Sequence, residues 1–114
     1  MSDCLFCKIR DGQIPAKKVH EDVSCFAFRD INPQAPSHIL VVPREHIPTL
    51  NDLDEGHAAL AGHLLVVAAQ VAKAEGHAES GWRAVFNVNK QGGQLVFHIH
   101  LHVLGGRSFG WPPG

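Results

Sequence analysis

Three histidines stand at alternate positions in the segment Phe97-His98-Ile99-His100-Leu101-His102-Val103. In a β-strand, alternate side chains share a face, so we expect the histidines on one face and the intervening apolar residues on the core face. At roughly 3.3 Å per residue, neighbouring histidines lie about 7 Å apart and the outer two about 13 Å apart. All three rings cannot easily bind one ion, so the three histidines must have different roles.

The spacing leaves three interpretations open. The histidines can be a row of polar residues facing solvent. Two of them can hold a metal ion, as in an H-x-H site. One can be a nucleophile on phosphorus, because a neutral imidazole with a fixed tautomer attacks well near neutral pH. The strict register and the adjacent pairs Gly92-Gly93 and Gly105-Gly106 argue against the first interpretation.

Length and charge set the limits for any such site. The chain has 114 residues, 45% of them apolar, which predicts a single domain over residues 1–114 with one core. Ten basic and eleven acidic side chains give a net charge of −1. The protein therefore lacks the positive electrostatic potential that would attract nucleic acid. The N-terminus lacks the pattern of a signal peptide, and His63 and Gln70 interrupt the longest apolar run. These features predict a cytoplasmic protein without a membrane partner.

The elements that must position the histidines follow from periodicity. Apolar residues from Leu53 to Val71 recur at helical spacing, with Asn51 or Asp52 as the cap and Gly76 as the terminator. A short helix is predicted over residues 4–11, and strands over 19–21, 23–29, 38–42, 83–89 and 95–104. Five strands in hairpin-like order with one long helix predict an α+β domain built on an antiparallel sheet.

The segment "HIHLHVLGG" resembles the histidine triad (HIT) superfamily of nucleotide hydrolases and transferases. The stretches "IPAKKVHEDVSCFAFRDINPQAPSHILVVPREHI", "NKQGGQ" and "WPPG" resemble its histidine triad nucleotide-binding (HINT) branch. The resemblance implies a HIT-like fold with a five-stranded sheet, one long helix and a short N-terminal helix. It also implies a hydrolase that releases AMP or GMP from a purine nucleoside phosphoramidate or a related conjugate, without a metal for the chemistry.

By this resemblance, His100 attacks the α-phosphorus and becomes transiently nucleotidylated. That chemistry needs a neutral ring whose far nitrogen donates to a backbone carbonyl. His102 matches the residue that contacts the phosphate oxygens or the leaving atom. His38 matches a buried histidine behind the nucleophile, which is either a proton relay or a satisfied supporting residue.

The resemblance also implies a nucleotide-binding set. Asp30 matches the acceptor of the ribose hydroxyls, Asn87 a residue that touches phosphate or ribose, and the backbone amides of Gly93 and Gln94 a phosphate-binding turn. Without the triad beside it, "QGGQ" is better explained as a flexible hairpin turn. The residues that match the apolar wall for the purine are Phe6, Ile9, Phe28, Ile31 and Leu40. Each of them, taken alone, is better explained by ordinary core packing.

One position departs from the family. Many members of this branch have a serine after Gly-Gly-Gln that donates to the phosphate or the leaving group, whereas this chain has Leu95. One such donor is worth about 3 kcal/mol in a preorganised site. Either His102 and backbone donors suffice, or phosphoramidates turn over more slowly.

Cys4 and Cys7 form a C-x-x-C pair, which in a reducing compartment indicates a metal or redox site before a disulfide. The pair can also be two small buried apolar residues. Some microbial members of the superfamily carry zinc on positions like Cys4, Cys7, His46 and His98, so we predict a structural zinc there. Cys25 is expected only in the core. The resemblance further implies a homodimer with Trp111 near the partner's active site.

The sequence is also compatible with two other classes of function. The chain can be a nucleotide-binding interaction module with incidental turnover, or a zinc-dependent binding protein with the triad as ligands. Within the enzymes, a dinucleoside polyphosphate hydrolase or a nucleotidylyltransferase is the closest rival.

Overall fold

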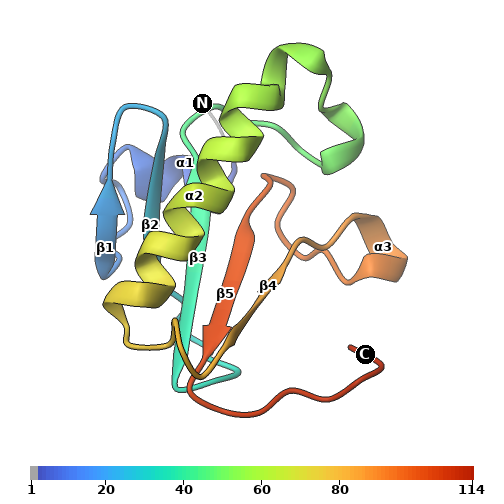
Figure 1. Cartoon of the computed structure of the whole chain (residues 1–114). Helices are drawn as coiled ribbons and strands as arrows, with labels where there is room; N and C mark the ends of the chain where they lie inside the picture. The colour runs from blue at the N-terminus through green and yellow to red at the C-terminus, as the bar shows by residue number, and fades with distance from the viewer. Residues whose placement is uncertain (1–2) are drawn as a thin grey trace.

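The computed structural model describes residues 3–114 as a five-stranded sheet with helices on both faces (Figure 1). The strands run in the order β1-β2-β3-β5-β4 and every neighbouring pair is antiparallel. The predicted α+β class is therefore confirmed, but the order is not that of successive hairpins, because β5 lies between β3 and β4. The strands are β1 (Lys18–Glu21), β2 (Cys25–Arg29), β3 (Ser37–Pro43), β4 (Trp82–Val85) and β5 (Leu101–Gly105).

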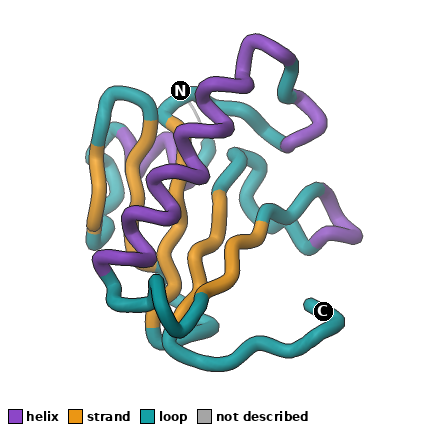
Figure 2. The backbone as a smooth tube through the Cα atoms, in the orientation of Figure 1, coloured by secondary structure: helices purple, strands orange, loops and turns teal. Residues whose placement is uncertain are grey.

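The long helix α2 (Ala58–Ala74) crosses one face of the sheet (Figure 2). Its buried side chains, Leu64, Val67, Ala68, Val71 and Ala72, pack on alternate residues of the central strands. Gly76, at φ 89°, follows the helix in the left-handed conformation, as its position in the sequence predicted. The strand residues in this core are Cys25, Ala27, Ile39, Val41, Leu101 and Val103.

The other face of the sheet carries a second, smaller core. Phe26 and Phe28 of β2 and Leu40 and Val42 of β3 pack there against the short helix α1 (Leu5–Arg10), which contributes Phe6 and Ile9. Strand β3 is thus buried along its whole length, as its continuous apolar run indicates. Because α1 is only six residues long, it covers one end of this face and leaves the rest for a site.

The stretch from Glu55 to Ala74 is long and apolar enough to cross a membrane by length and composition. One such helix is weak evidence for a membrane protein, because a helix that covers a sheet passes the same test. The apolar side chains of α2 that are buried contact the sheet.

The strand predicted over residues 95–104 begins only at Leu101. The pairing of β3 with β5 ends at Val41 and Leu101, and two residues further along β3 stands Pro43, which has no N–H to donate. Residues 95–100 therefore leave the sheet, and the amide of Ile99 donates to the carbonyl of Ile47 over 2.7 Å. His98 and His100 precede the strand, so the predicted common face of one strand is wrong for the triad. Phe97, expected in the core, is half exposed.

Other boundaries also differ from the prediction. Strand β4 ends at Val85, and residues 89–92 form a helical turn, α3 (Asn89–Gly92), in place of a plain hairpin loop. The long helix begins at Ala58 and not near Leu53. Two 3-10 turns precede it, η1 (Leu50–Asp52) and η2 (Glu55–His57), and their caps are Thr49 and Asp54, not Asn51 or Asp52. Val23, assigned to a strand, is exposed in the β1–β2 turn.

Candidate active site

A pocket of about 490 Å³ opens on the sheet face that α1 covers only in part. This volume is within the range of small-molecule sites. Apolar atoms dominate its wall, and two histidines of the triad are among its polar lining residues. The residues predicted from the sequence that line it are Phe6, Ile9, Phe28, Asp30, Ile31, His38, Leu40, Asn87, Gly93, Leu95, His100 and His102.

His100 has a fixed ring orientation. Its Nδ1 lies 2.9 Å from the carbonyl oxygen of His98, which can only accept, so the ring proton sits on Nδ1 and the lone pair belongs to Nε2. The Phe6 ring packs edge-on against it at 4.9 Å between centroids. Burial lowers the pKa of His100, only partly offset by the hydrogen bond to His98 and by the charge of Asp30. The ring is therefore neutral at neutral pH, as a nucleophile requires.

His102 and His38 form a directed hydrogen-bonded chain. The amide of Gln34 donates to Nδ1 of His38 over 3.0 Å, so the proton of a neutral His38 is on Nε2. That nitrogen lies 2.9 Å from Nδ1 of His102, which must accept, and the proton of His102 is left on Nε2. Burial, followed by the charges of His100 and His38, lowers the pKa of His102 to about 4. The His38–His102 pair thus leaves one N–H donor on His102, whose ring centroid lies 4.9 Å from that of His100.

Asp30 lies at the end of β2, beside this chain. Its Oδ1 accepts from the amide of Asn32 over 2.9 Å, and its Oδ2 lies 3.5 Å from Nε2 of His38. The side chain is 21% exposed, so the carboxylate remains accessible to a ligand from the pocket. An acceptor oxygen near the histidines, at the edge of an apolar pocket, suits a pair of hydroxyl donors.

The turn at Gly93 is built differently from the expectation. Gly93 lines the pocket in the left-handed conformation, φ 82°, but its amide donates to Lys90 O over 3.1 Å. Gln94 does not line the pocket. Its amide donates to Asn89 O, and its buried side chain accepts from Asn89 N and donates to Pro48 O and Val96 O. Gln94 thus holds the turn in place, and the phosphate-binding role of its amide stays a prediction.

The sequence did not identify every residue of the pocket. Gln34 was missed, although it fixes the tautomer of His38 through its amide, because a backbone donor leaves no signal in residue type. Leu5, Ile14 and Ala16 extend the apolar wall. At the mouth, Ile31 is fully exposed and Leu95 is 90% exposed, so both are available to a ligand. Trp111, in the tail, is exposed and is not part of the pocket lining.

Four soft and borderline donors meet behind the triad. The ligand atoms of Cys4, Cys7, His46 and His98 all lie within 4.8 Å of one another. Nδ1 of His98 is 3.3 Å from Cys4 Sγ, 3.6 Å from Cys7 Sγ and 3.2 Å from His46 Nδ1. The corners of a tetrahedral zinc site with two sulfur and two nitrogen ligands are spaced by about 3.3–3.8 Å. The donor set and its spacing therefore fit zinc.

His98 joins this cluster to the triad. Its Nε2 donates to the carbonyl of Pro43 over 2.8 Å, which places the lone pair on Nδ1, toward the two sulfurs. Its own carbonyl accepts from His100. Burial lowers the pKa of His98 to about 4 and raises the pKa of the Cys4 thiol. The first histidine of the triad thus faces away from the pocket, and the other two face it.

Comparisons with known proteins agree with this geometry. The family model described as the HIT domain matches residues 11–109. The chain is 48% identical over 108 residues, 95% of this chain and 91% of the relative, to the purine nucleoside phosphoramidase of Escherichia coli K12. It is 51% identical over 112 residues, 98% of this chain and 97% of the relative, to an uncharacterized HIT-like protein of Synechococcus elongatus.

Among solved structures, a HIT family hydrolase from Legionella pneumophila superposes with a TM-score of 0.96 at 55% identity, covering 98% of this chain and all of that one. The match of fold, length and sequence spans both the sheet and the segment that carries the triad. The chain therefore belongs to the HIT family.

Proposed function

We propose that this protein is a hydrolase of purine nucleoside 5′-phosphate conjugates, above all phosphoramidates, and that it acts through a nucleotidyl group carried on His100. The observation that carries the proposal is the pair of fixed tautomers in the pocket. His100 offers a lone pair at Nε2, and His102 offers a proton at its own Nε2. The name of the E. coli relative, a purine nucleoside phosphoramidase, supports the substrate class. The sequence stretches quoted above favour the HINT branch of the family.

In the first step, Nε2 of His100 forms a bond to the α-phosphorus while the bond from phosphorus to the leaving nitrogen breaks. The bonding electron pair departs with the nitrogen, which takes up one proton from solvent. Nδ1 of His100 keeps its proton, so the ring becomes cationic, and the carbonyl of His98 stabilises that charge. His102 donates from Nε2 to the phosphate oxygens or to the leaving atom.

In the second step, water attacks the same phosphorus, the bond to His100 breaks, and one proton returns to solvent. AMP or GMP is released and the neutral ring of His100 is restored. In this proposal Asp30 accepts from the ribose hydroxyls, and Phe6, Phe28 and Leu40 contact the base; that all four line the pocket supports these roles. No step needs a metal ion.

The direct test uses a fluorogenic adenosine phosphoramidate and its guanosine counterpart with the wild-type protein and His100→Ala. We expect turnover by the wild type only. Rapid acid quenching followed by mass measurement of the intact protein should find one added nucleotidyl group on the wild type. Turnover in the variant at the wild-type rate would refute the assignment. A diadenosine polyphosphate offered in parallel separates the closest rival activity.

We also propose that Cys4, Cys7, His46 and His98 hold a structural zinc ion. The donor chemistry and the tetrahedral spacing support it. The ion would join α1 to the segment after β3 and to the segment before β5. Two thiolates kept as ligands suit a reducing compartment, which is consistent with a cytoplasmic location.

A homodimer is the assembly that we propose. Strand β4 is an edge of the sheet among the described residues, and an unpaired edge favours pairing with another strand. Trp111 is 85% exposed, which is unusual for so large an apolar ring. Light scattering after size-exclusion chromatography tests this directly: the expected mass is twice the 12.4 kDa of one chain, and the mass of one chain would refute it.

A further inference from the structure

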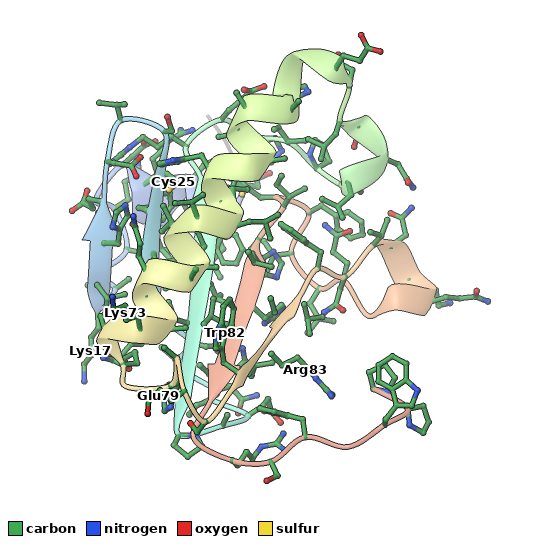
Figure 3. All side chains as sticks on the ribbon, in the orientation of Figure 1. Lys17, Cys25, Lys73, Glu79, Trp82 and Arg83 are labelled. Atoms are coloured by element: carbon green, nitrogen blue, oxygen red, sulfur yellow. The ribbon has the colours of Figure 1, made fainter. Side chains whose placement is uncertain are left out.

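A second cluster of metal-binding side chains lies away from the pocket, where α2 passes the turn between β1 and β2. It contains His20 from β1, Asp22 from the turn, Cys25 from the start of β2 and His63 from α2. Figure 3 labels Cys25 where β2 begins, beside α2. The ligand atoms of His20, Asp22 and Cys25 lie within 4.8 Å of one another. None of the four residues lines the pocket.

The carboxylate of Asp22 is held so that one oxygen faces the other three side chains. Its Oδ1 accepts from the amides of Ser24 and Cys25 over 2.7 and 2.8 Å. Its Oδ2 lies 2.7 Å from His20 Nε2, 2.8 Å from His63 Nε2 and 3.5 Å from Cys25 Sγ. Backbone amides at the β1–β2 turn thus hold Oδ1 of Asp22. Two imidazole nitrogens and one sulfur surround its Oδ2.

We propose that His20, Asp22, Cys25 and His63 form a binding site for a divalent cation of the zinc class. Two imidazoles, one carboxylate oxygen and one sulfur are donors that zinc, cobalt and nickel accept in tetrahedral geometry. With zinc–ligand bonds of about 2.0–2.3 Å, the sulfur and the oxygen stand about 3.5 Å apart, as they do here. The two nitrogens must draw back from Asp22 by about half an ångström, since the tetrahedral separation is about 3.3 Å. His63 lies 2.8 Å from Asp22 but outside the group of three whose ligand atoms are within 4.8 Å of one another, so its ring must also move toward His20 and Cys25 to complete the site.

Access favours the site, and its two anionic ligands outweigh the nearby cation Arg44, whose Nε donates to the carbonyl of Asp22 over 2.7 Å. The side chains of His20 and His63 are 26% and 39% exposed, so an ion reaches them from solvent, while Cys25 is buried behind. The carboxylate and a thiolate together neutralise a doubly charged ion. Burial raises the pKa of the Cys25 thiol to about 12, so its proton leaves to solvent only as the ion takes its place. Each imidazole proton moves from Nε2 to Nδ1.

The bound ion would tie α2 to the β1–β2 hairpin. This role differs from that of the Cys4, Cys7, His46 and His98 cluster, which lies behind the triad and joins other segments. Zinc binding at the two sites can therefore be measured separately. Neither site depends on the proposed chemistry at His100.

The test counts metal in the full chain. Protein stripped with a chelator is dialysed against a fixed concentration of free zinc, and zinc per chain is measured by elemental analysis. We expect His20→Ala/His63→Ala to bind one equivalent fewer than the wild type, and His57→Ala, which removes a histidine outside the cluster, to bind as much as the wild type. Equal zinc in the double variant and the wild type would overturn the proposal.

Two further measurements cover the case in which the double variant does not fold and distinguish this site from the Cys4, Cys7, His46 and His98 cluster. His63→Gln changes only a half-exposed side chain on α2, so it replaces the double variant if that protein does not fold. In Cys4→Ala/Cys7→Ala, added cobalt should still give the sulfur-to-cobalt absorption of one site, and Cys25→Ala in that background should abolish it. Absence of this absorption in Cys4→Ala/Cys7→Ala would show that the cluster is a hydrogen-bond network and not a cation site.

Discussion

His38 Nε2 and His102 Nδ1 lie 2.9 Å apart and share a single proton. Because Gln34 N donates to the far nitrogen of His38, that proton belongs to His38 and points at His102. A second proton on the pair would have to break one of these two hydrogen bonds. The two hydrogen bonds therefore favour the neutral form of both rings and leave the Nε2–H group of His102 as a donor in the pocket.

Loss of the nucleophile should abolish turnover. His100→Ala and His100→Gln are expected to lower kcat by at least about 10⁴-fold, as the removal of other covalent nucleophiles does. The glutamine variant fills the space but cannot form the intermediate. Steady-state assays with a fluorogenic phosphoramidate measure the effect, and His57→Ala, outside the pocket, should retain wild-type rates.

Removal of the donor at His102 should depend on the leaving group. We expect His102→Ala to lower kcat by about 10²-fold to 10³-fold for an alkyl amine, whose departure needs assistance, and much less for a good leaving group such as a nitrophenolate. His38→Ala should show the same pattern with a smaller loss of about 10-fold to 100-fold. An equal loss for both leaving groups would mean that these residues only shape the pocket.

The acid limb of the pH profile should lie below the ordinary pKa of histidine. Burial lowers the pKa of His102 to about 4 and also lowers that of His38. A lowered pKa keeps the neutral form, so kcat/KM should stay constant as the pH falls from 8 to about 6.5 and decline only at lower pH. Because the charge of Asp30 raises both pKa values, Asp30→Asn should move the acid limb to still lower pH. A midpoint at or above 6.5 in the wild type contradicts this account.

Removal of the zinc ion proposed at Cys4, Cys7, His46 and His98 should affect stability more than chemistry. A bound ion at about 100 times its dissociation constant adds about 3 kcal/mol. Chelation or Cys7→Ala should therefore lower the melting temperature by about 10–20 °C. Turnover well below that temperature should persist. Loss of turnover without unfolding would instead place the ion on Asp30, His38 and His102, whose ligand atoms also lie within 4.8 Å of one another.

Leu95→Ser should increase activity without a cost in stability. Leu95 is 90% exposed at the pocket, so its replacement removes little packing, and the free energy of unfolding should change by less than about 0.5 kcal/mol. The new hydroxyl can donate to the phosphate or the leaving group, and we expect kcat on an amine conjugate to rise by about 10-fold to 100-fold. Leu95→Ala is the matched control and should give no increase.

The periodic elements of the fold could be predicted from the sequence. The apolar spacing along α2 and Gly76 after it marked the helix that covers the sheet, and the continuous apolar run of β3 marked the central strand. The failures have tertiary causes. Residues 95–100 alternate like a strand, but their partner strand ends at Pro43, so they pair with the loop at Ile47 instead.

Most residues of the pocket could be recognised from their types, but the orientation and protonation of their side chains could not. Histidines and Asp30 could be recognised as chemistry-bearing side chains, whereas the backbone contacts of Gln34 and of His98 O, which decide the tautomers, have no signature in the sequence. The same holds for His63. Only the packing of α2 across the sheet brings it to Asp22, forty-one positions earlier in the chain.

The contact from residue 98 to His100 has an evolutionary consequence. His100 is oriented by the main-chain oxygen of that residue, not by its imidazole. A homologue can therefore replace the imidazole of residue 98 and the thiols of residues 4 and 7 by aliphatic side chains. The orientation of the His100 ring would be kept, because it depends on a main-chain oxygen. The proposed reaction at His100 is therefore compatible with either the presence or the loss of the proposed metal site.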